Sequence, residues 1–362
     1  MRLFKCQACR QILYFENTLC EKCGHRLGYL PLAATLSAVE PEGDAWKALA
    51  SPGTLHRFCA NAQYDACNWL IEAPSPEMLC LSCRHNRTIP DVGVEANLAA
   101  WRRIEHAKHR LFYSLIRLQL SLVTRGENQQ TGLAFDFLAD PPQAGGPQSE
   151  GPRVMTGHDD GLITLSLQEA DDAERERNRV AMHEPYRTLL GHFRHEIGHY
   201  FWDRLVFDAP DGGRLEAFRA LFGDERADYG QALQRHYDQG APADWQSRFV
   251  TAYATMHPWE DFAETWAHYL HIVDTLEIAG AFGLSTQPAL TQGEELHASV
   301  DFDPYHAATM QQLSESWLPL TVAVNSLNRA MGQPDLYPFV LSTPALEKLA
   351  FVHGPVHPAA AP

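Results

Sequence analysis

Residues 191–200 read GHFRHEIGHY, and this stretch contains the pattern His-Glu-x-x-His at His195, Glu196 and His199. On an α-helix, residues four positions apart lie on one face, so both imidazoles can bind a single zinc ion. The glutamate between them then lies beside the water molecule that such an ion activates. The pattern therefore predicts a catalytic zinc site, although two ordinary histidines of an amphipathic helix would give the same letters.

The residues around this motif predict the helix that carries it. Pro185 can open a helix, because the first helical turn does not need the N–H group that proline lacks. Apolar residues then recur at three- and four-residue steps and form a buried stripe, which leaves another flank for the histidines. The stripe consists of Tyr186, Leu189, Leu190, Phe193, Ile197, Phe201 and Leu205. We therefore expect the histidines to border a cleft.

A third zinc ligand must come from elsewhere in the chain, because catalytic zinc usually has three protein ligands and one open position. In the metzincin pattern a glycine and a third histidine follow closely, but this chain has Trp202 and Leu205 at those two places. That form is therefore excluded, and a glutamate on a later helix is the alternative.

Residues 251–276 read TAYATMHPWEDFAETWAHYLHIVDTL and predict such a helix, with its start at Pro258. Glu260, Glu264 and His268 follow at four-residue steps and share one face. We expect Glu260 to bind the metal and Glu264 to accept a hydrogen bond from a ligand histidine. The exchanged assignment and a solvated acidic face are the alternatives.

The N-terminal residues contain two cysteine patterns, and the first is regular. Cys6, Cys9, Cys20 and Cys23 give C-x2-C-x10-C-x2-C. Two residues between cysteines let both thiolates face one ion, and two such pairs complete a tetrahedron. The pattern predicts a structural zinc site, with a redox pair or free core thiols as the alternative.

The second cysteine pattern is less regular. Cys59, Cys67, Cys80 and Cys83 give C-x7-C-x12-C-x2-C. We expect a second structural zinc site with four cysteine ligands. Two alternatives stay open: Cys59 or Cys67 is a core residue, or His56 or His85 replaces one of them as a ligand.

Composition divides the 362 residues near position 90. All eight cysteines precede that position, and residues 1–90 carry a net charge of +1, whereas the whole chain carries −16. We expect an α+β protein with a zinc-ribbon region over 1–90 and a mostly helical metallopeptidase domain with a small sheet over 91–362. The anionic excess argues against nucleic acid and anionic membranes as partners, since both favour cationic surfaces.

The early cysteines also bear on location, because the segment from Met1 to Cys6 leaves no room for an apolar secretory stretch. No segment approaches the ~20 apolar residues of a membrane span. We therefore expect a cytoplasmic protein, in which cysteines bind metal more often than they form disulfides.

The second part of the chain shows a few further signals before it becomes mostly helical. Periodicity predicts a helix over Glu95–Thr124, and strands are predicted over Gly132–Leu138 and Gly161–Leu167. Proline and glycine predict a loop over Asp140–Arg153. The strand over Gly161–Leu167 could be the sheet edge on which a peptide substrate lies by strand addition, or plain sheet.

Taken together, GHFRHEIGHYFWDRL and HPWEDFAETWAHYLHIVDTL after two cysteine ribbons resemble the bacterial zinc-ribbon, zinc-binding metallopeptidase family. The phrases CNWL, NRTIPD, EADDAERERNR, LNRAMG and DLYPFVL are also similar to that family. The resemblance implies a gluzincin, in which two histidines and a glutamate hold zinc. In lethal-factor-type gluzincins the first glutamate of an E-x-x-x-E pair is the ligand, which supports Glu260. A tyrosine seven residues before that ligand assists catalysis there, and Tyr253 has this position here.

The expected function is a zinc-dependent metallopeptidase that hydrolyses peptide bonds with a zinc-activated water. Glu196 is the predicted general base, and Tyr253 is predicted to donate a hydrogen bond to the developing oxyanion. The expected cofactors are one catalytic and two structural zinc ions, and the expected partner is a peptide or protein substrate. The alternative is a non-catalytic zinc-binding protein whose ribbons bind protein or nucleic acid.

Overall fold

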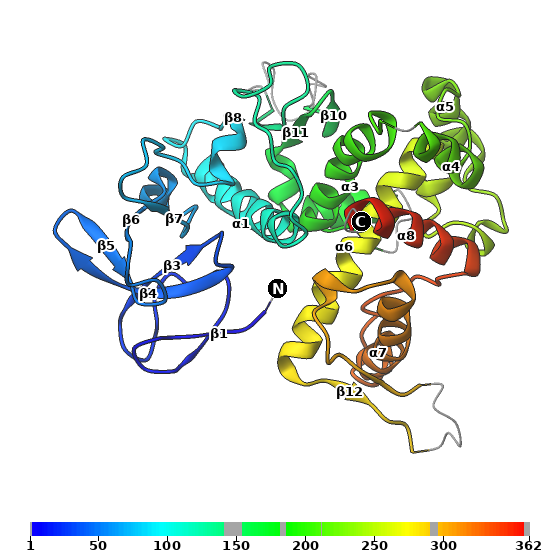
Figure 1. Ribbon diagram of the computed structural model, residues 1–362. Coiled ribbons are helices and arrows are strands. Elements are labelled where there is room, and N and C mark those ends of the chain that lie inside the picture. Colours follow the sequence, from blue (N-terminus) through cyan, green and yellow to red (C-terminus); the bar gives the residue numbers. More distant parts are fainter. Residues whose placement is uncertain (1, 141–153, 182–185, 211, 290–295, 358–362) are drawn as a thin grey trace. The chain divides into compact units, whose positions relative to one another are not determined.

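The computed structural model describes residues 2–140, 154–181, 186–210, 212–289 and 296–357 (Figure 1). The chain forms two compact units. The first comprises Met1–Ala181 with Thr188–Phe193, and the second comprises Met182–Arg187 with Arg194–Pro362. The predicted mixed α+β class is confirmed, with the cysteine-containing sheets first and most helices after them. The predicted domain boundary near residue 90 concerns sequence modules rather than packing, and it stays a prediction.

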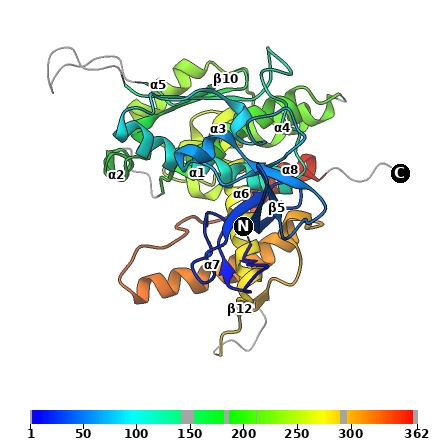
Figure 2. The same cartoon turned by 90° about the vertical axis from the view of Figure 1, so that its left-hand side faces the viewer.

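The N-terminal part of the first unit is all strand and turn. A short hairpin pairs β1 (Phe4–Lys5) with β2 (Ile12–Leu13). An antiparallel five-stranded sheet follows in chain order, shown in blue in Figure 2. Its strands are β3 (Arg26–Leu30), β4 (Thr35–Glu42), β5 (Ala45–Ala48), β6 (Leu55–Phe58) and β7 (Leu70–Glu72).

The five-stranded sheet carries a small apolar cluster. It consists of Leu30, Val39, Ala48 and Leu70, with Trp46 and Phe58 packed against them. Gly28 belongs to the same packing, because a Cβ there would lie 2.6 Å from Cγ of Leu70. Further side chains of β3 and β4 are also buried, namely Leu27, Tyr29, Leu36 and Ala38.

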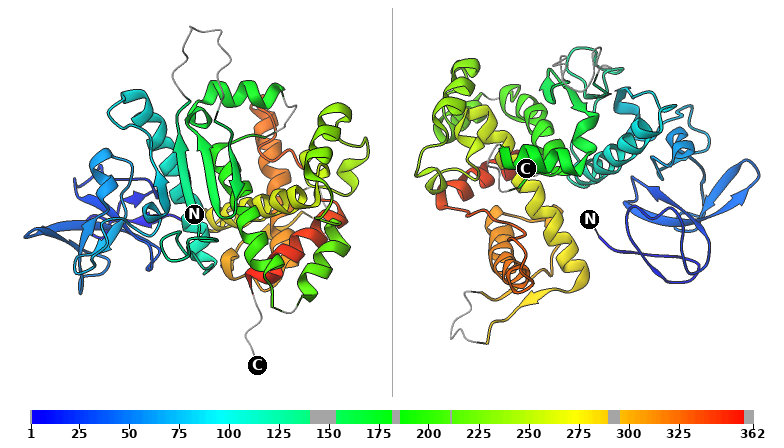
Figure 3. Two further views of the ribbon diagram at one scale, coloured as in Figure 1. Left: turned by 90° about the horizontal axis from the view of Figure 1, so that it is seen from above. Right: turned by 180° about the vertical axis from the view of Figure 1, so that it is seen from behind.

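The rest of the first unit packs a long helix, α1 (Glu95–Arg117), near a four-stranded sheet. The order of its strands is β10, β11, β9, β8, as the view from above shows (Figure 3). The strands are β8 (Asn86–Thr88), β9 (Ala134–Leu138), β10 (Gly157–Asp159) and β11 (Leu162–Ser166). The rings of Phe112 on α1 and Phe135 on β9 lie 6.0 Å apart, which joins helix and sheet in one core. The short helix α2 (Asp172–Ala181) follows the sheet.

Two expectations about this unit are wrong in part. The predicted helix over Glu95–Thr124 ends at Arg117, because Leu120 donates its N–H to the carbonyl of Leu115 over 3.1 Å. Gln119 takes the left-handed conformation, with φ of 55°, so the helix is capped without the glycine that usually signals such an end.

The predicted strand over Gly161–Leu167 exists as β11, but it is not an edge. It pairs with β9 on one side and with β10 on the other. Its backbone groups are therefore already used, and β11 cannot receive a peptide by strand addition. The residues Gly-His-Asp of β10 have no apolar alternation, so this covering strand could not be predicted from its pattern. The strand predicted over Gly132–Leu138 is confirmed as β9.

The second unit is mostly helical, as predicted, and contains the C-terminal part of α3 (Leu189–Trp202), which a π-helical turn over Asp203–Phe207 extends. Its other helices are α4 (Gly213–Phe222), α5 (Tyr229–Gln239), α6 (Pro258–Phe282), α7 (Met310–Ala330) and α8 (Thr343–Val356). Two short strands, β12 (Ser285–Thr286) and β13 (Ala298–Ser299), form a hairpin.

Helix α6 is the centre of this unit, and its predicted start is confirmed. Pro258 occupies the first turn, and the ring of His257 accepts a hydrogen bond from the N–H of Trp259, which caps the helix. Most of its side chains are buried.

Some expectations fall outside the part of the chain that the structure describes, namely residues 141–153 of the predicted loop and the helix start at Pro185. Among the described helices, none is both long enough and apolar enough for a bilayer crossing.

Candidate metal centres

Two helices of the second unit bring the predicted zinc ligands together. His195 and His199 lie one turn apart on α3, and Glu260 lies in the first turn of α6. Gly198 permits the close approach of these helices, since a Cβ there would lie 3.0 Å from Cα of Ala263 and 3.2 Å from Cβ of Trp266. The motif thus contains a glycine where the helices cross, and the crossing determines where the carboxylate lies.

The donor atoms converge on one point. The two Nε2 atoms of His195 and His199 are 3.2 Å apart. Oε2 of Glu260 lies 2.9 Å from Nε2 of His195, and its Oε1 lies 3.6 Å from Nε2 of His199. One atom from each of the three residues fits within a span of 4.8 Å. Glu260 and His199 are buried, whereas His195 is partly exposed.

Glu264 lies behind His195 rather than among the converging atoms. Its Oε1 is 2.6 Å from Nδ1 of His195. A carboxylate can only accept, so Nδ1 carries the hydrogen, and when the ring is neutral, as metal binding requires, Nε2 presents its lone pair towards Glu260 and His199. This arrangement corresponds to the expected division of roles between Glu260 and Glu264.

The electrostatics of this group favour a cation. Burial opposes a charged imidazole, but Glu260 and Glu264 raise the pKa of His195 well above its ordinary value. Burial would also raise the pKa of Glu260, yet His199 and His195 hold it well below its usual range. Two nitrogens and a carboxylate that face one another at these distances are a donor set that zinc prefers. The residues present therefore fit a divalent zinc ion.

Two tyrosines complete the surroundings. The hydroxyl of Tyr229, in the first turn of α5, donates a hydrogen bond of 2.9 Å to Oε1 of Glu260. The ring centre of Tyr253 lies 6.0 Å from that of His195. Burial and the charge of Glu260 raise the pKa of Tyr253, so it remains a proton donor. Sequence analysis missed Tyr229, because it lies 31 residues before Glu260 outside any motif.

Glu196 follows His195 on α3 and is only half-buried. Burial and Glu260 raise the pKa of Tyr229, and the charge of Glu196 adds to this effect. Glu196 therefore acts electrostatically on the same group of residues that surrounds the candidate ligands.

The first cysteine set in the first unit also converges. Sγ of Cys6 lies 3.6 Å from that of Cys23, and Sγ of Cys9 lies 3.6 Å from that of Cys20. Although burial opposes it, backbone and side-chain hydrogen bonds from Cys23 lower the pKa of Cys20 to about 7. A thiolate is the form that binds metal.

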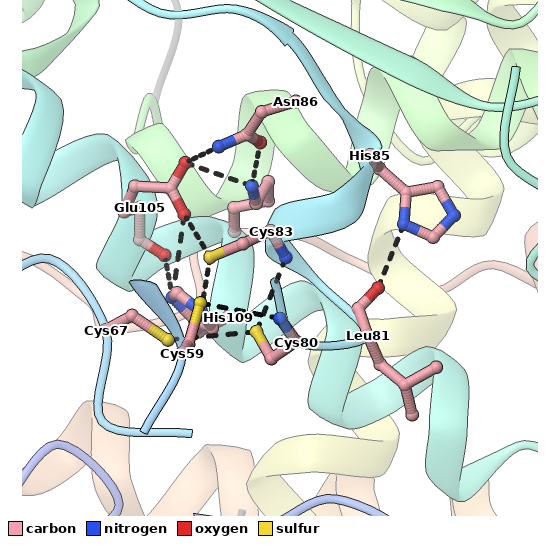
Figure 4. Close-up of polar contacts among 10 residues, drawn as sticks. Cys59, Cys67, Cys80, Leu81, Cys83, His85, Asn86, Glu105 and His109 are labelled. Atoms are coloured by element: carbon pink, nitrogen blue, oxygen red, sulfur yellow. Dashed lines mark hydrogen bonds and ion pairs between the residues drawn. The ribbon is translucent and has the colours of Figure 1, made fainter. Parts of the chain in front are cut away.

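The second cysteine set converges too, and it lies among other polar side chains (Figure 4). Sγ of Cys67 and Cys80 are 3.7 Å apart, and backbone N–H groups of Cys80 and Cys83 donate to Sγ of Cys59 and Cys80 over 3.4 Å. Such N–H···S bonds are typical of tight turns around a metal, and all eight cysteines of the chain are free of disulfides.

The two histidines considered as replacement ligands do not belong to the second set. His85 directs Nδ1 to the carbonyl oxygen of Leu81 at 2.9 Å, and His56 is on β6. The four sulfurs lie within 4.8 Å of one another without either ring. The two sets of four cysteines are therefore suited to two structural zinc ions.

Comparison with known proteins agrees with these sites. Residues 97–355 match the family model described as "Putative zinc-binding metallo-peptidase", and residues 3–94 match a zinc-ribbon domain. The uncharacterized proteins Rv2568c of Mycobacterium tuberculosis and Mb2598c of Mycobacterium bovis are each 43% identical over 353 residues, covering 98% of this chain and 94% of the relative. No solved structure matches the chain significantly. The chain thus belongs to the zinc-binding metallo-peptidase family, with a zinc-ribbon domain at its N-terminal end.

Proposed function

We propose that this protein is a zinc-dependent peptidase of the gluzincin type, in which His195, His199 and Glu260 hold the catalytic ion. The observation that carries the proposal is the convergence of two Nε2 atoms and one carboxylate within 4.8 Å, with a glutamate next to the first histidine. A site with three protein ligands leaves one position for the reacting groups, which distinguishes catalytic from structural zinc.

Zinc at this place would supply Lewis acidity, which polarises a peptide carbonyl and makes a water molecule more acidic. Glu196 accepts the proton of the attacking water and then passes it to the departing amine. Its neighbouring position on α3 and its partial exposure suit a base that must meet both water and substrate. Glu264 holds the ring of His195 in the orientation and tautomer that binding requires.

The tyrosines act on the developing negative charge and on the ligand carboxylate. Tyr253 stays protonated and donates a hydrogen bond to the oxyanion, a contact of about 3 kcal/mol when the donor is preorganised. Tyr229 keeps the carboxylate of Glu260 in place through its 2.9 Å hydrogen bond.

The two cysteine sets hold structural zinc in residues 1–90, and the remaining residues form the peptidase part. The substrate is a peptide or protein, as the family implies. Bound zinc adds its binding free energy to the folding of this region.

The test compares Glu196→Gln with wild type and with Glu216→Gln, which makes the same chemical change at an exposed position on α4. Glu196→Gln should keep its full zinc content and lose cleavage of casein and of a peptide library. Glu216→Gln should behave as wild type. Equal cleavage by Glu196→Gln would exclude Glu196 as the base, and no cleavage by the zinc-loaded wild type would favour the non-catalytic alternative.

A further inference from the structure

Helix α1 contributes two buried polar side chains to the surroundings of the second cysteine set. Oε2 of Glu105 lies 3.6 Å from Sγ of Cys83, and Nε2 of His109 lies 3.7 Å from the same sulfur (Figure 4). Cys83 and Glu105 are fully buried, and His109 is 4% exposed. These three residues form a second group whose donor atoms lie within 4.8 Å of one another.

The hydrogen bonds of His109 determine what its free nitrogen can do. Nδ1 lies 2.6 Å from the backbone carbonyl oxygen of Glu105, which can only accept, so Nδ1 carries the hydrogen. Nε2 of the neutral ring then directs a lone pair at Cys83, and the Cys80 thiol also interacts with this ring. A lone pair that faces thiolates is unfavourable unless a positive centre lies between them.

Glu105 has one oxygen occupied and one directed at the sulfur. Oε1 accepts hydrogen bonds from Asn86 over 2.7 Å and from the buried Lys108 over 3.0 Å. Oε2 is the oxygen that faces Cys83. Lys108 therefore neutralises the far side of the carboxylate, while the near oxygen faces Cys83, whose thiol donates to it when protonated, and lies 3.9 Å from Nδ1 of His109.

The distances are those of ligands that share an ion. Within the two cysteine sets, sulfur pairs lie 3.6, 3.6 and 3.7 Å apart. Glu105 and His109 stand at the same separation from Cys83. Thiolate, imidazole and carboxylate are the three ligand types that zinc prefers.

The net charge of the cluster also favours a second cation. Four thiolates, Glu105 and Lys108 around a single divalent ion leave two negative charges among buried side chains. A second divalent ion brings the cluster to neutrality, and buried charge is unfavourable when uncompensated.

We propose that a second zinc ion binds beside the one held by Cys59, Cys67, Cys80 and Cys83, with the Cys83 thiolate shared between both ions and with Glu105 and His109 as its own ligands. The second cysteine set is thus half of a two-metal centre that α1 completes. This proposal does not depend on the peptidase activity.

Metal analysis and cobalt spectroscopy test the proposal on the full chain. Wild type purified with zinc should hold one ion more than His109→Gln, whatever the occupancy of the His195, His199 and Glu260 site. His106→Gln, which changes an exposed histidine on the same helix, is the matched control and should hold as many ions as wild type. Glu105→Gln should also lose one ion.

Cobalt(II) gives a readout without any variant. Full loading of wild type should produce two cobalt ions that are magnetically coupled through the shared sulfur, so their electron paramagnetic resonance signal is weaker than that of separate ions. Uncoupled cobalt at full loading would overturn the proposal and leave a proton on His109 as the positive centre. An unchanged metal count in folded His109→Gln would overturn it as well.

Discussion

Nδ1 of His195 donates to Oε1 of Glu264 over 2.6 Å, although 69 residues separate them in the chain. This hydrogen bond links α3 and α6 at one of the two histidine rings of the candidate metal site. The position of the ring therefore depends on a carboxylate that does not itself bind the ion.

The first prediction follows from that bond. Glu264→Gln should keep the zinc site but weaken its zinc affinity by about 10- to 100-fold, since partners of this kind orient a ligand histidine. Glu260→Gln should abolish zinc binding at this site. Competition with a chromogenic chelator measures both affinities. If Glu264→Gln loses the ion entirely while Glu260→Gln retains it, the two assignments must be exchanged.

A second prediction concerns the helix crossing at Gly198. Gly198→Ala places a Cβ 3.0 Å from the backbone of Ala263 and should destabilise the protein by about 1–3 kcal/mol. Gly213→Ala is the control, because no atom lies within 4 Å of the Cβ it would add. Thermal unfolding of the zinc-loaded proteins measures the difference. Equal melting temperatures would show that the helices are less closely packed than described here.

A third prediction separates the two tyrosines. Tyr253→Phe should lower kcat by about 100-fold and leave the zinc content unchanged, because it removes one donor to the oxyanion. Tyr229→Phe should instead weaken zinc binding, because it removes a hydrogen bond to Glu260. Kinetics on a peptide substrate and metal analysis are both needed. Full activity of Tyr253→Phe would reduce Tyr253 to a packing residue.

The fourth prediction concerns pH and His268, which is 4% exposed. Burial lowers the pKa of its imidazole to about 4, although the charge of Glu264 opposes this effect. In the unfolded chain the imidazole of His268 is protonated below about pH 6.5, whereas in the folded protein it is protonated only below about pH 4. The contribution of His268 to the free energy of unfolding is therefore fully present above pH 6.5. It decreases by up to about 3 kcal/mol as the pH falls to 4.

Melting temperatures at pH 7 and pH 5.5 check this sign. His268→Gln should lose less stability than wild type over that interval, whereas His306→Gln, with an exposed ring, should follow wild type. If the melting temperatures of wild type and His268→Gln fall by the same amount between pH 7 and pH 5.5, the lowered pKa of His268 is contradicted.

A fifth prediction concerns metal removal from residues 1–90. A strong chelator should raise amide hydrogen exchange throughout β3 to β7, because the free energy of metal binding is part of the folding free energy of such a segment. The amides of the buried part of α6 should remain protected from exchange under the same conditions. Protection of the sheet that survives complete zinc removal would show that its apolar packing suffices.

Sequence patterns predicted the residues whose chemistry repeats along the chain. The His-Glu-x-x-His spacing and the cysteine pairs are local, so one helix turn or one tight turn already brings their donors together. Glu260 needed a second helix, and its start at Pro258 could be read from the proline. The order of the four-stranded sheet could not be predicted in the same way, because β10 is short and polar.

The residues that sequence analysis missed are those that tertiary packing alone brings to a site. Tyr229 reaches Glu260 from another helix, and no spacing rule connects them. Glu105 and His109 lie on a helix that looked purely amphipathic, yet both are buried beside Cys83. Gln119 ends α1 in a conformation that glycine would normally adopt, which explains the overlong helix prediction.

The contacts of Cys83 with Glu105 and His109 on α1 affect how this chain can be divided into fragments. The zinc-ribbon match ends at residue 94 and the peptidase match begins at residue 97, but Asn86, Glu105 and Lys108 form one hydrogen-bonded cluster across that junction. A peptidase fragment cut there would keep a buried lysine and glutamate and lose the asparagine and the sulfur that cover them. The zinc-ribbon region and the residues after it thus share one buried polar cluster, so we expect a cut between residues 94 and 97 to destabilise both fragments.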